Sequence, residues 1–197
     1  MKKPALVMSA FIRDKRSVRG GFSLPELLTV LAIVGIICSI TVPALSSLYG
    51  SCCLKAAIFE LCDMLKEAKQ SALSNGGDYA ITFDTAKGLI ALVSGKGADN
   101  KWNTSDDPVV RSFLLRSKGG GLRFGYGNYG PIKGLEEAPD GVTFQTNNTC
   151  VCNPELTGNA GTVYIMSAKG AAMALKMNST AYGYFLYRWD GKQWVRM

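Results

Sequence analysis

Histidine is absent from this sequence of 197 residues. Without an imidazole, the chain lacks the usual general base, the Ser/His and Cys/His nucleophile pairs and the ligand of most zinc sites. It also lacks a glycine-rich loop between a strand and a helix, the arrangement that binds phosphate. The triplet Gly119–Gly121 lies among predicted strands and indicates a bend. We therefore expect no enzyme activity, no catalytic residue, no cofactor and no metal site.

Charged residues are missing from Leu27–Val42, and a single carboxylate, Glu26, precedes this apolar run. With its apolar neighbours, the run is long enough to cross about 30 Å of hydrocarbon at about 1.5 Å per helical residue. Pro25 suits the first turn of a helix, where its missing N–H leaves no hydrogen bond unmade. The sequence thus predicts a membrane-spanning helix over residues 22–45.

The segment before this helix holds most of the positive charge. Residues 1–21 contain six basic residues and one acidic residue, so they carry +5 of the chain's net +7, and the rest carries +2. Basic residues beside a membrane span favour the cytoplasmic side. The high isoelectric point is therefore a property of a leader over residues 1–21 and does not indicate nucleic-acid binding.

The leader meets the helix at Gly21 and Phe22. Glycine, which has no side chain, allows a protease to hold the backbone closely. A carboxylate such as Glu26 costs about 2.5–3.5 kcal/mol at the centre of a membrane helix and less near the interface, so it needs a positive partner. Cleavage after Gly21 would create an α-amino group on Phe22, and this amine on another chain is the natural partner for Glu26.

The motif Gly21-Phe22-Ser23-Leu24-Pro25-Glu26, followed by an apolar run with Pro43 near its end, resembles the class III signal of type IV pilins and type II secretion pseudopilins. The resemblance implies cleavage between Gly21 and Phe22 by a prepilin peptidase, N-methylation of Phe22, a role for Glu26 in assembly, and a kink or local melting at Pro43. It also implies a single-pass protein of the bacterial inner membrane with its C-terminal domain in the periplasm. Its partners would be other pilins or pseudopilins and the inner-membrane assembly platform. The alternative is an ordinary signal anchor with a chance Gly-Phe pair.

An amphipathic helix is predicted to continue from residue 46 to about residue 75. Its apolar positions recur at steps of three and four, which places them on one face, and we expect this face to pack on the chain's own sheet. The helix should end at Asn75–Asp78, where the glycines can take a left-handed cap. The apolar stripe comprises Leu54, Ile58, Leu61, Leu65, Ala68 and Ala72.

Short β-type runs, separated by glycines and polar loops, follow the helix. They predict an antiparallel β domain of about 120 residues over 76–197, so the expected fold class is α+β with the long helix packed on a sheet or sandwich. The expected strands cover residues 79–83, 89–93, 109–115, 122–126, 142–144, 162–166, 173–177, 182–189 and 193–196. This order resembles the GspH/FimT-type minor pilins, with Gly141–Phe144 and Gly161–Ile165 as the best-matched pieces. Residues 146–161 have no clear counterpart in that pattern.

Six cysteines are present. Cys38 lies in the predicted span, and we interpret it as a small apolar packing residue. If the β domain is exported, disulfides between the helix and the Cys-Val-Cys pair can form, although their connectivity cannot be read from sequence. A metal or redox site is the alternative, but the pair lacks Cys-x-x-Cys spacing. The candidates for disulfide bonding are Cys52, Cys53, Cys62, Cys150 and Cys152.

The loop over residues 94–108 is rich in Asp and Asn, which could supply oxygen ligands to calcium. It lacks the EF-hand spacing and a closing Glu, so a solvated loop is the favoured interpretation.

Two functions from different classes fit the sequence. In the first, the chain is a minor pilin or pseudopilin that assembles into a type II secretion pseudopilus or a type IV pilus, near the tip, and supports protein secretion. In the second, it is a FimT-like minor pilin that binds DNA through Arg188, Lys192 and Arg196. The first is favoured, and we expect no nucleic-acid partner, because the chain after residue 21 carries only +2.

Overall fold

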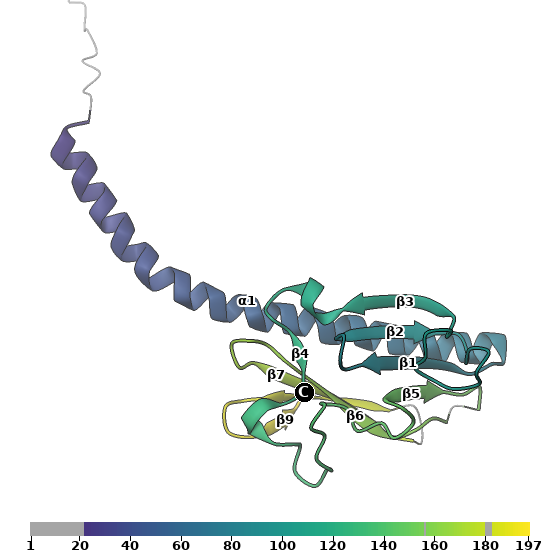
Figure 1. The fold of residues 1–197 in the computed structure, drawn as a ribbon. Helices are drawn as coiled ribbons and strands as arrows, with labels where there is room; N and C mark the ends of the chain where they lie inside the picture. The colour runs from purple at the N-terminus through teal and green to yellow at the C-terminus, as the bar shows by residue number, and fades with distance from the viewer. Residues whose placement is uncertain (1–21, 156, 180–182) are drawn as a thin grey trace, which may run out of the picture. The chain divides into compact units, whose positions relative to one another are not determined.

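The computed structural model describes residues 22–155, 157–179 and 183–197, apart from the side chains at 43, 44, 46 and 47. In these residues the fold is α+β. A long helix, α1 (Leu24–Asn75), is followed by strands that form two antiparallel sheets (Figure 1). The chain divides between Val42 and Pro43 into two compact parts, which are treated separately below.

In the second part, the sequence of α1 places one apolar face against the rest of the domain. All six residues of the predicted stripe are buried, from Leu54 to Ala72, with at most 1% of any side chain exposed. The helix ends where Gly76 takes a positive φ of 64° and its N–H donates to the Ala72 carbonyl at 3.0 Å. Both the packing face and the glycine cap predicted from the sequence are confirmed.

The first sheet has the order β3-β2-β1-β5. β1 (Tyr79–Asp84) and β2 (Leu89–Val93) form a hairpin, in which the Lys87 N–H donates to Asp84 Oδ1 at 2.9 Å. β3 (Val109–Leu114) pairs with β2 on one side, and β5 (Thr149–Cys152) pairs with β1 on the other.

The second sheet has the order β4-β6-β7-β8-β9. It is a meander in which neighbouring strands along the chain pair, except that β5 belongs to the first sheet. A 3₁₀ turn over Leu115–Lys118 leads from β3 toward this sheet, and a second one covers Gly127–Tyr129. The strands are β4 (Arg123–Phe124), β6 (Gly161–Met166), β7 (Ala172–Met177), β8 (Tyr184–Trp189) and β9 (Trp194–Arg196).

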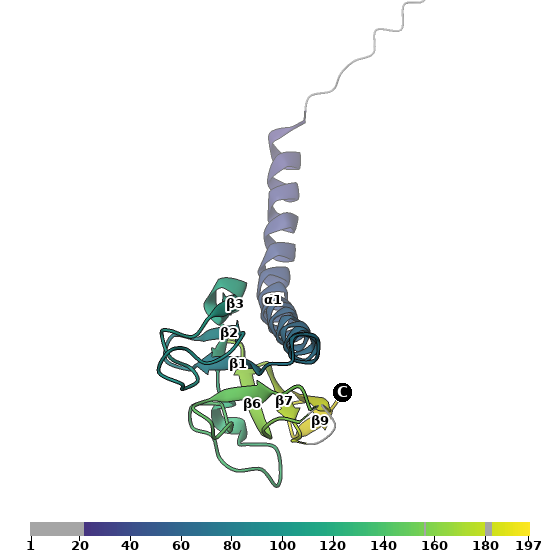
Figure 2. The ribbon, with the colours of Figure 1, turned by 90° about the vertical axis from the view of Figure 1, so that its right-hand side faces the viewer.

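One core joins the second part of α1 to both sheets, which lie beside it in Figure 2. Phe83 of β1 stacks on Phe144 with ring centroids 5.6 Å apart and meets Phe124 of β4 edge to face at 6.2 Å. These contacts connect the first sheet to the second. The helix stripe is therefore covered by the chain's own sheets, because an amphipathic helix is stable only when its apolar face is buried.

Two features of the sheets differ from the sequence-based prediction. The strand predicted over 142–144 is wrong: Val142 forms only an isolated bridge to Val163. β5, which the sequence did not predict, depends on residues distant in sequence. On one side β5 pairs with β1. On its other side, the Asn159 side chain accepts from the Val151 N–H at 2.7 Å and donates to the Thr149 carbonyl at 2.6 Å.

The Gly119–Gly121 bend is confirmed. All three glycines have positive φ, between 61° and 81°. A Cβ placed on Gly120 would lie 3.0 Å from Cys53 Cβ and 3.2 Å from Gly50 Cα, so the bend runs directly against α1. Only residues without side chains allow this approach together with this backbone conformation.

Candidate assembly site

The segment Leu24–Val42 of α1 is long and apolar enough to cross a membrane, by length and composition. Every side chain in it is exposed, beginning with Phe22, just before the helix, at 79%. In water, a continuous apolar surface of this size is unfavourable at about 25 cal/mol per Å². This segment therefore needs lipid or other protein chains around it.

The hydroxyl groups within this segment are satisfied by the helix itself. Thr29 Oγ1 donates to the Glu26 carbonyl at 2.9 Å, Ser39 Oγ to the Ile36 carbonyl at 2.7 Å and Thr41 Oγ1 to the Ile37 carbonyl at 2.8 Å. Such bonds to the preceding turn remove the cost of placing a hydroxyl in an apolar environment. The segment thus presents no unsatisfied hydroxyl to lipid or to a neighbouring helix.

Glu26 lies in the first turn of α1 and is exposed. Within the described part of the chain its carboxylate has neither an ion pair nor a hydrogen bond. The N-terminus of a helix favours a negative charge, typically by about 0.3–1 kcal/mol, which does not offset removal of a carboxylate from water. A positive partner for this carboxylate would have to come from outside the described residues.

Gly21, with the rest of the predicted leader, lies outside the described residues. Pro43 falls within α1, which is helical on both sides of it. Cleavage after Gly21, methylation of Phe22, the pairing of Glu26 and a kink at Pro43 all stay predictions.

A second apolar surface, which the sequence analysis did not identify, lies on the second part of α1. Leu45, Leu48, Tyr49 and Phe59 are between 51% and 62% exposed. They fall on the side of the helix opposite the buried stripe, together with the exposed Cys52. Beyond Phe59 this side becomes polar, with Asp63, Lys66 and Gln70 exposed. The spacing of three and four from Leu45 to Cys52, with Phe59 two turns further on, was the signal that could have revealed it.

All six cysteines are free thiols in the structure. Cys38 and Cys52 are exposed, whereas Cys53, Cys62, Cys150 and Cys152 are buried in the main core. Burial raises the pKa of the Cys62 thiol to about 11, which keeps it protonated and makes it an unreactive packing residue. Disulfide bonding of the five candidate cysteines stays a prediction.

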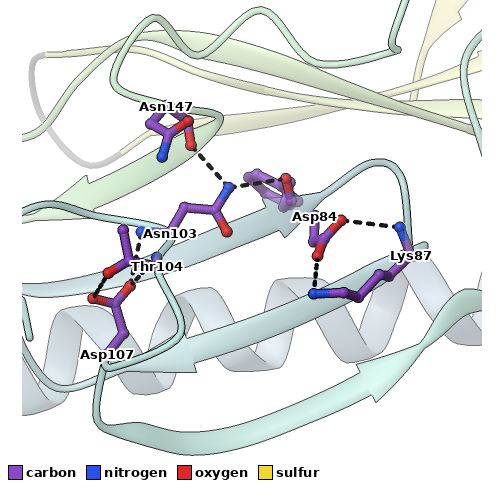
Figure 3. Close-up of polar contacts among 7 residues, drawn as sticks. Asp84, Lys87, Asn103, Thr104, Asp107 and Asn147 are labelled. Atoms are coloured by element: carbon purple, nitrogen blue, oxygen red, sulfur yellow. Dashed lines mark hydrogen bonds and ion pairs between the residues drawn. The ribbon is translucent and has the colours of Figure 1, made fainter.

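The Asp-rich loop is held together by its own carboxylates. Asp107 is buried, and its oxygens accept from the backbone N–H groups of Asn103 at 2.7 Å and Thr104 at 3.2 Å (Figure 3). They also accept from the Gly97 N–H at 3.2 Å. Hydrogen bonds from the Thr104 hydroxyl and the Asp99 N–H lower the pKa of Asp106. Among the described residues there is no group of three or more His, Cys, Asp or Glu side chains that could hold a metal ion.

Asn103 ties this loop to the rest of the domain. Its side-chain amide donates to the Phe83 carbonyl at 3.3 Å and to the Asn147 carbonyl at 3.0 Å (Figure 3). In the same view, Asp84 accepts from the Lys87 N–H and pairs with its ammonium at 3.0 Å, and the backbone hydrogen bond in particular lowers the pKa of Asp84. These polar side chains thus make structural contacts within the domain.

The three candidate DNA-contacting residues do not share one surface. On β8, Arg188 is opposite Val195, while Arg196 of β9 is opposite Tyr187, so the two guanidinium groups belong to opposite faces of the sheet. Arg196 stacks on the Phe185 ring at 3.9 Å, and Lys192 lies in the turn between the strands. A phosphate backbone cannot contact both arginines through a single face.

The nearby aromatic residues hold a loop in place. Trp194 Nε1 donates to the Gly130 carbonyl at 3.0 Å, and Trp189 stacks on Tyr129 with centroids 4.7 Å apart. Tyr129 in turn donates to the Gly170 carbonyl at 2.7 Å. The tryptophans therefore hold Tyr129 and Gly130 against the second sheet.

No family model and no curated protein sequence matches the chain. Among solved structures, it is similar to the minor pseudopilin EpsH from the Type 2 Secretion System of Vibrio cholerae. The sequence identity is 13% and the TM-score 0.41, over 73% of this chain and 95% of that chain.

Proposed function

We propose that this chain is a minor pilin or pseudopilin, a structural subunit that a prepilin peptidase cleaves between Gly21 and Phe22. The mature chain, methylated on Phe22, is held in the bacterial inner membrane by its apolar helix, with the second part of the protein in the periplasm. The assembly platform then moves it into a type II secretion pseudopilus or a type IV pilus, near the tip, where it supports protein secretion.

The observation that carries this proposal is the combination of one carboxylate with a fully exposed apolar helix. Glu26 has no partner in the described chain, and nothing in the described chain covers Leu24–Val42. A helix that only anchored the protein in lipid would be more stable without Glu26. A helix that assembles with others can use the carboxylate to bind the α-amino group of a neighbouring Phe22, and this pair would define the axial register.

The apolar residues Leu45, Leu48 and Phe59 fit the same function. They are exposed on the part of α1 that carries the β domain, where a lipid anchor has no need of them. Burial of large apolar side chains contributes about 1.5–3 kcal/mol each, so contact with neighbouring subunits here would stabilise an assembly.

DNA uptake is the weaker candidate. Clustered cations facing phosphates are required for it, and Arg188 and Arg196 lie on opposite faces of the second sheet.

The proposal is tested by the mass of the chain isolated from cells with and without a prepilin peptidase. With the peptidase, we expect a chain that begins at Phe22 and carries one additional methyl group. A Gly21→Leu variant should keep residues 1–21, whereas a Gly20→Ala variant serves as the matched control and should be cleaved. A full-length chain in the presence of an active peptidase that cleaves a known substrate would overturn the proposal.

A further inference from the structure

A groove with a volume of about 340 Å³ lies between α1 and the second sheet. Leu54 of α1 and Met173 of β7 line it, and since each is only 1% exposed or less, they form an apolar floor. Two exposed cations flank the groove, Lys55 of α1 and Arg188 of β8. Arg188 is opposite Met173 in the pairing of β8 with β7, and Met173 belongs to the main core. The Arg188 side chain therefore lies on the face of the sheet that is turned toward α1.

Positive charge predominates at this groove. Neither Lys55 nor Arg188 forms an ion pair within the described residues. Asp190, the one carboxylate among the residues that line the groove, accepts through its Oδ1 from two backbone N–H groups of its own turn at 2.8 Å each. A third cation lies close by, since Lys169 Cβ is 3.8 Å from the position that a Cβ would take on Gly50 of α1. Such a groove favours an anionic occupant.

An acidic loop of the same chain offers the complementary charge. Residues 130–140 contain three carboxylates and a single cation, Lys133, so their net charge is −2. Glu136 and Glu137 are exposed, and in the described part of the chain neither makes an ion pair or a hydrogen bond. Both carboxylates are therefore available to a partner.

This loop lies on the face of the second sheet that points away from α1. Ile132 packs on Tyr164 and Ala174, and its N–H donates to the Tyr164 hydroxyl at 3.1 Å. Ala174 follows Met173 in β7, so the two side chains point to opposite faces of the sheet. In Figure 1 the loop that follows β4 extends below the sheet, while α1 runs above it. The loop therefore cannot enter the groove of its own chain.

We propose that the groove binds Glu136 and Glu137 of a second copy of this chain. Charge complementarity carries this assignment: the loop presents two carboxylates, and the groove presents two cations beside an apolar floor that the glutamate methylene groups can cover. The contact joins different faces of two copies, so it is heterologous and can repeat from one copy to the next. This inference goes beyond the function proposed above, and it requires neither cleavage after Gly21 nor a role for Glu26.

The test is zero-length cross-linking with a carbodiimide, which forms an amide bond between a carboxylate and an amine in contact with it. Full chains in detergent, some of them labelled with ¹⁵N, are mixed and reacted at low salt, where exposed charge pairs are least screened. We expect mass spectrometry to find Lys55 joined to Glu136 or Glu137, with one labelled and one unlabelled chain in the product. Links within a single chain should not form, because its loop and groove lie on opposite faces.

Arg188→Gln is the decisive variant, since it weakens the groove but leaves both reactive groups in place. We expect it to lower the yield of this product by about two- to fivefold, as for the loss of one exposed ion pair. Arg116→Gln, which removes an exposed arginine outside the groove, is the matched control and should react like the parent chain.

Three outcomes would overturn the proposal. The first is the absence of a link between Lys55 and these glutamates, or links spread evenly over other lysines. The second is an equal yield from Arg188→Gln and Arg116→Gln. The third is coupling of Lys55 only to a different protein in membranes of the producing cells, which would assign the groove to that protein.

Discussion

The guanidinium group of Arg111 on β3 lies 3.1 Å from the carboxylate of Glu60 on α1. The same guanidinium reaches Glu67 at 3.7 Å, and Lys118 forms a second ion pair with Glu60. Glu60 is therefore shared by two cations, one on β3 and one in the 3₁₀ turn that follows it. Since its side chain is only 20% exposed, this network connects the helix to the edge of the first sheet where solvent screening is reduced.

We expect Glu60→Ala to lower the free energy of unfolding by about 1 kcal/mol, because two cations lose their shared partner. Asp63→Ala is the matched control on the same helix. The Asp63–Lys66 pair is more than 60% exposed on both sides, so this variant should not differ measurably from wild type. Urea unfolding of the purified chain gives both values, and equal effects would show that the network contributes nothing.

Gly120 should tolerate no side chain. We expect Gly120→Ala to destabilise the protein by about 1–3 kcal/mol, because the new Cβ meets Gly50 and Cys53 of α1 while φ stays at 66°. Gly76→Ala separates the cost of the close contact from the cost of the positive φ. Gly76 has a φ of 64°, but nothing lies within 4 Å of its added Cβ, so this variant should cost only the backbone term of about 1 kcal/mol. A smaller effect at Gly120 than at Gly76 would contradict the close approach to the helix.

Asp107→Asn should loosen the loop over residues 94–108. The amide keeps only one acceptor oxygen, so its NH2 group would face either the N–H of Gly97 or the N–H groups of Asn103 and Thr104, at a cost of about 1–3 kcal/mol. Faster trypsin cleavage after Lys96 and Lys101 is the expected result. Asp78→Asn, at an exposed position outside this network, should be cleaved like wild type. An unchanged cleavage rate in Asp107→Asn would mean that the carboxylate does not hold the loop.

Asp84 should contribute to the acid sensitivity of the domain. Its pKa is lower in the folded chain, chiefly because the Lys87 N–H binds the charged form. The stabilisation is therefore complete above the unfolded pKa of about 3.9 and is lost as the pH falls through the lower folded value. Asp84→Asn should be less stable than wild type at pH 7, and this difference should shrink below about pH 4. A difference independent of pH would exclude this role.

Local patterns were enough to predict α1 and most of the strands. The spacing of Leu54, Ile58 and Leu61 was sufficient to orient the helix, and glycines near residues 76 and 120 marked its end and the bend. β5 was not predictable in this way, because Asn159 and β1 supply its hydrogen bonds from elsewhere in the chain. The same limit applies to Met177 beside Cys150, a contact that depends on how the two sheets pack.

In the candidate assembly site, too, some residues were predictable from local sequence patterns and others were not. Phe22 and Glu26 could be singled out because their spacing is local, and a carboxylate at the start of an apolar helix is rare. The exposed residues Leu48 and Phe59 follow a periodicity that is also visible in the sequence, but their exposure became evident only when the opposite stripe was found buried. Arg188 and Arg196 looked like neighbours in the sequence, yet strand alternation separates their side chains.

The proposed role of Glu26 is to bring this subunit into an assembly. The direct measurement is the fraction of processed chain that cross-links to co-expressed pilins or enters sheared filaments. Glu26→Ala should still be cleaved and inserted but should assemble about tenfold less or worse, since leaving one partner of a buried charge pair alone costs about 3–5 kcal/mol. Asp63→Ala, the matched control, should assemble like wild type. Assembly of Glu26→Ala at the wild-type level would contradict the account.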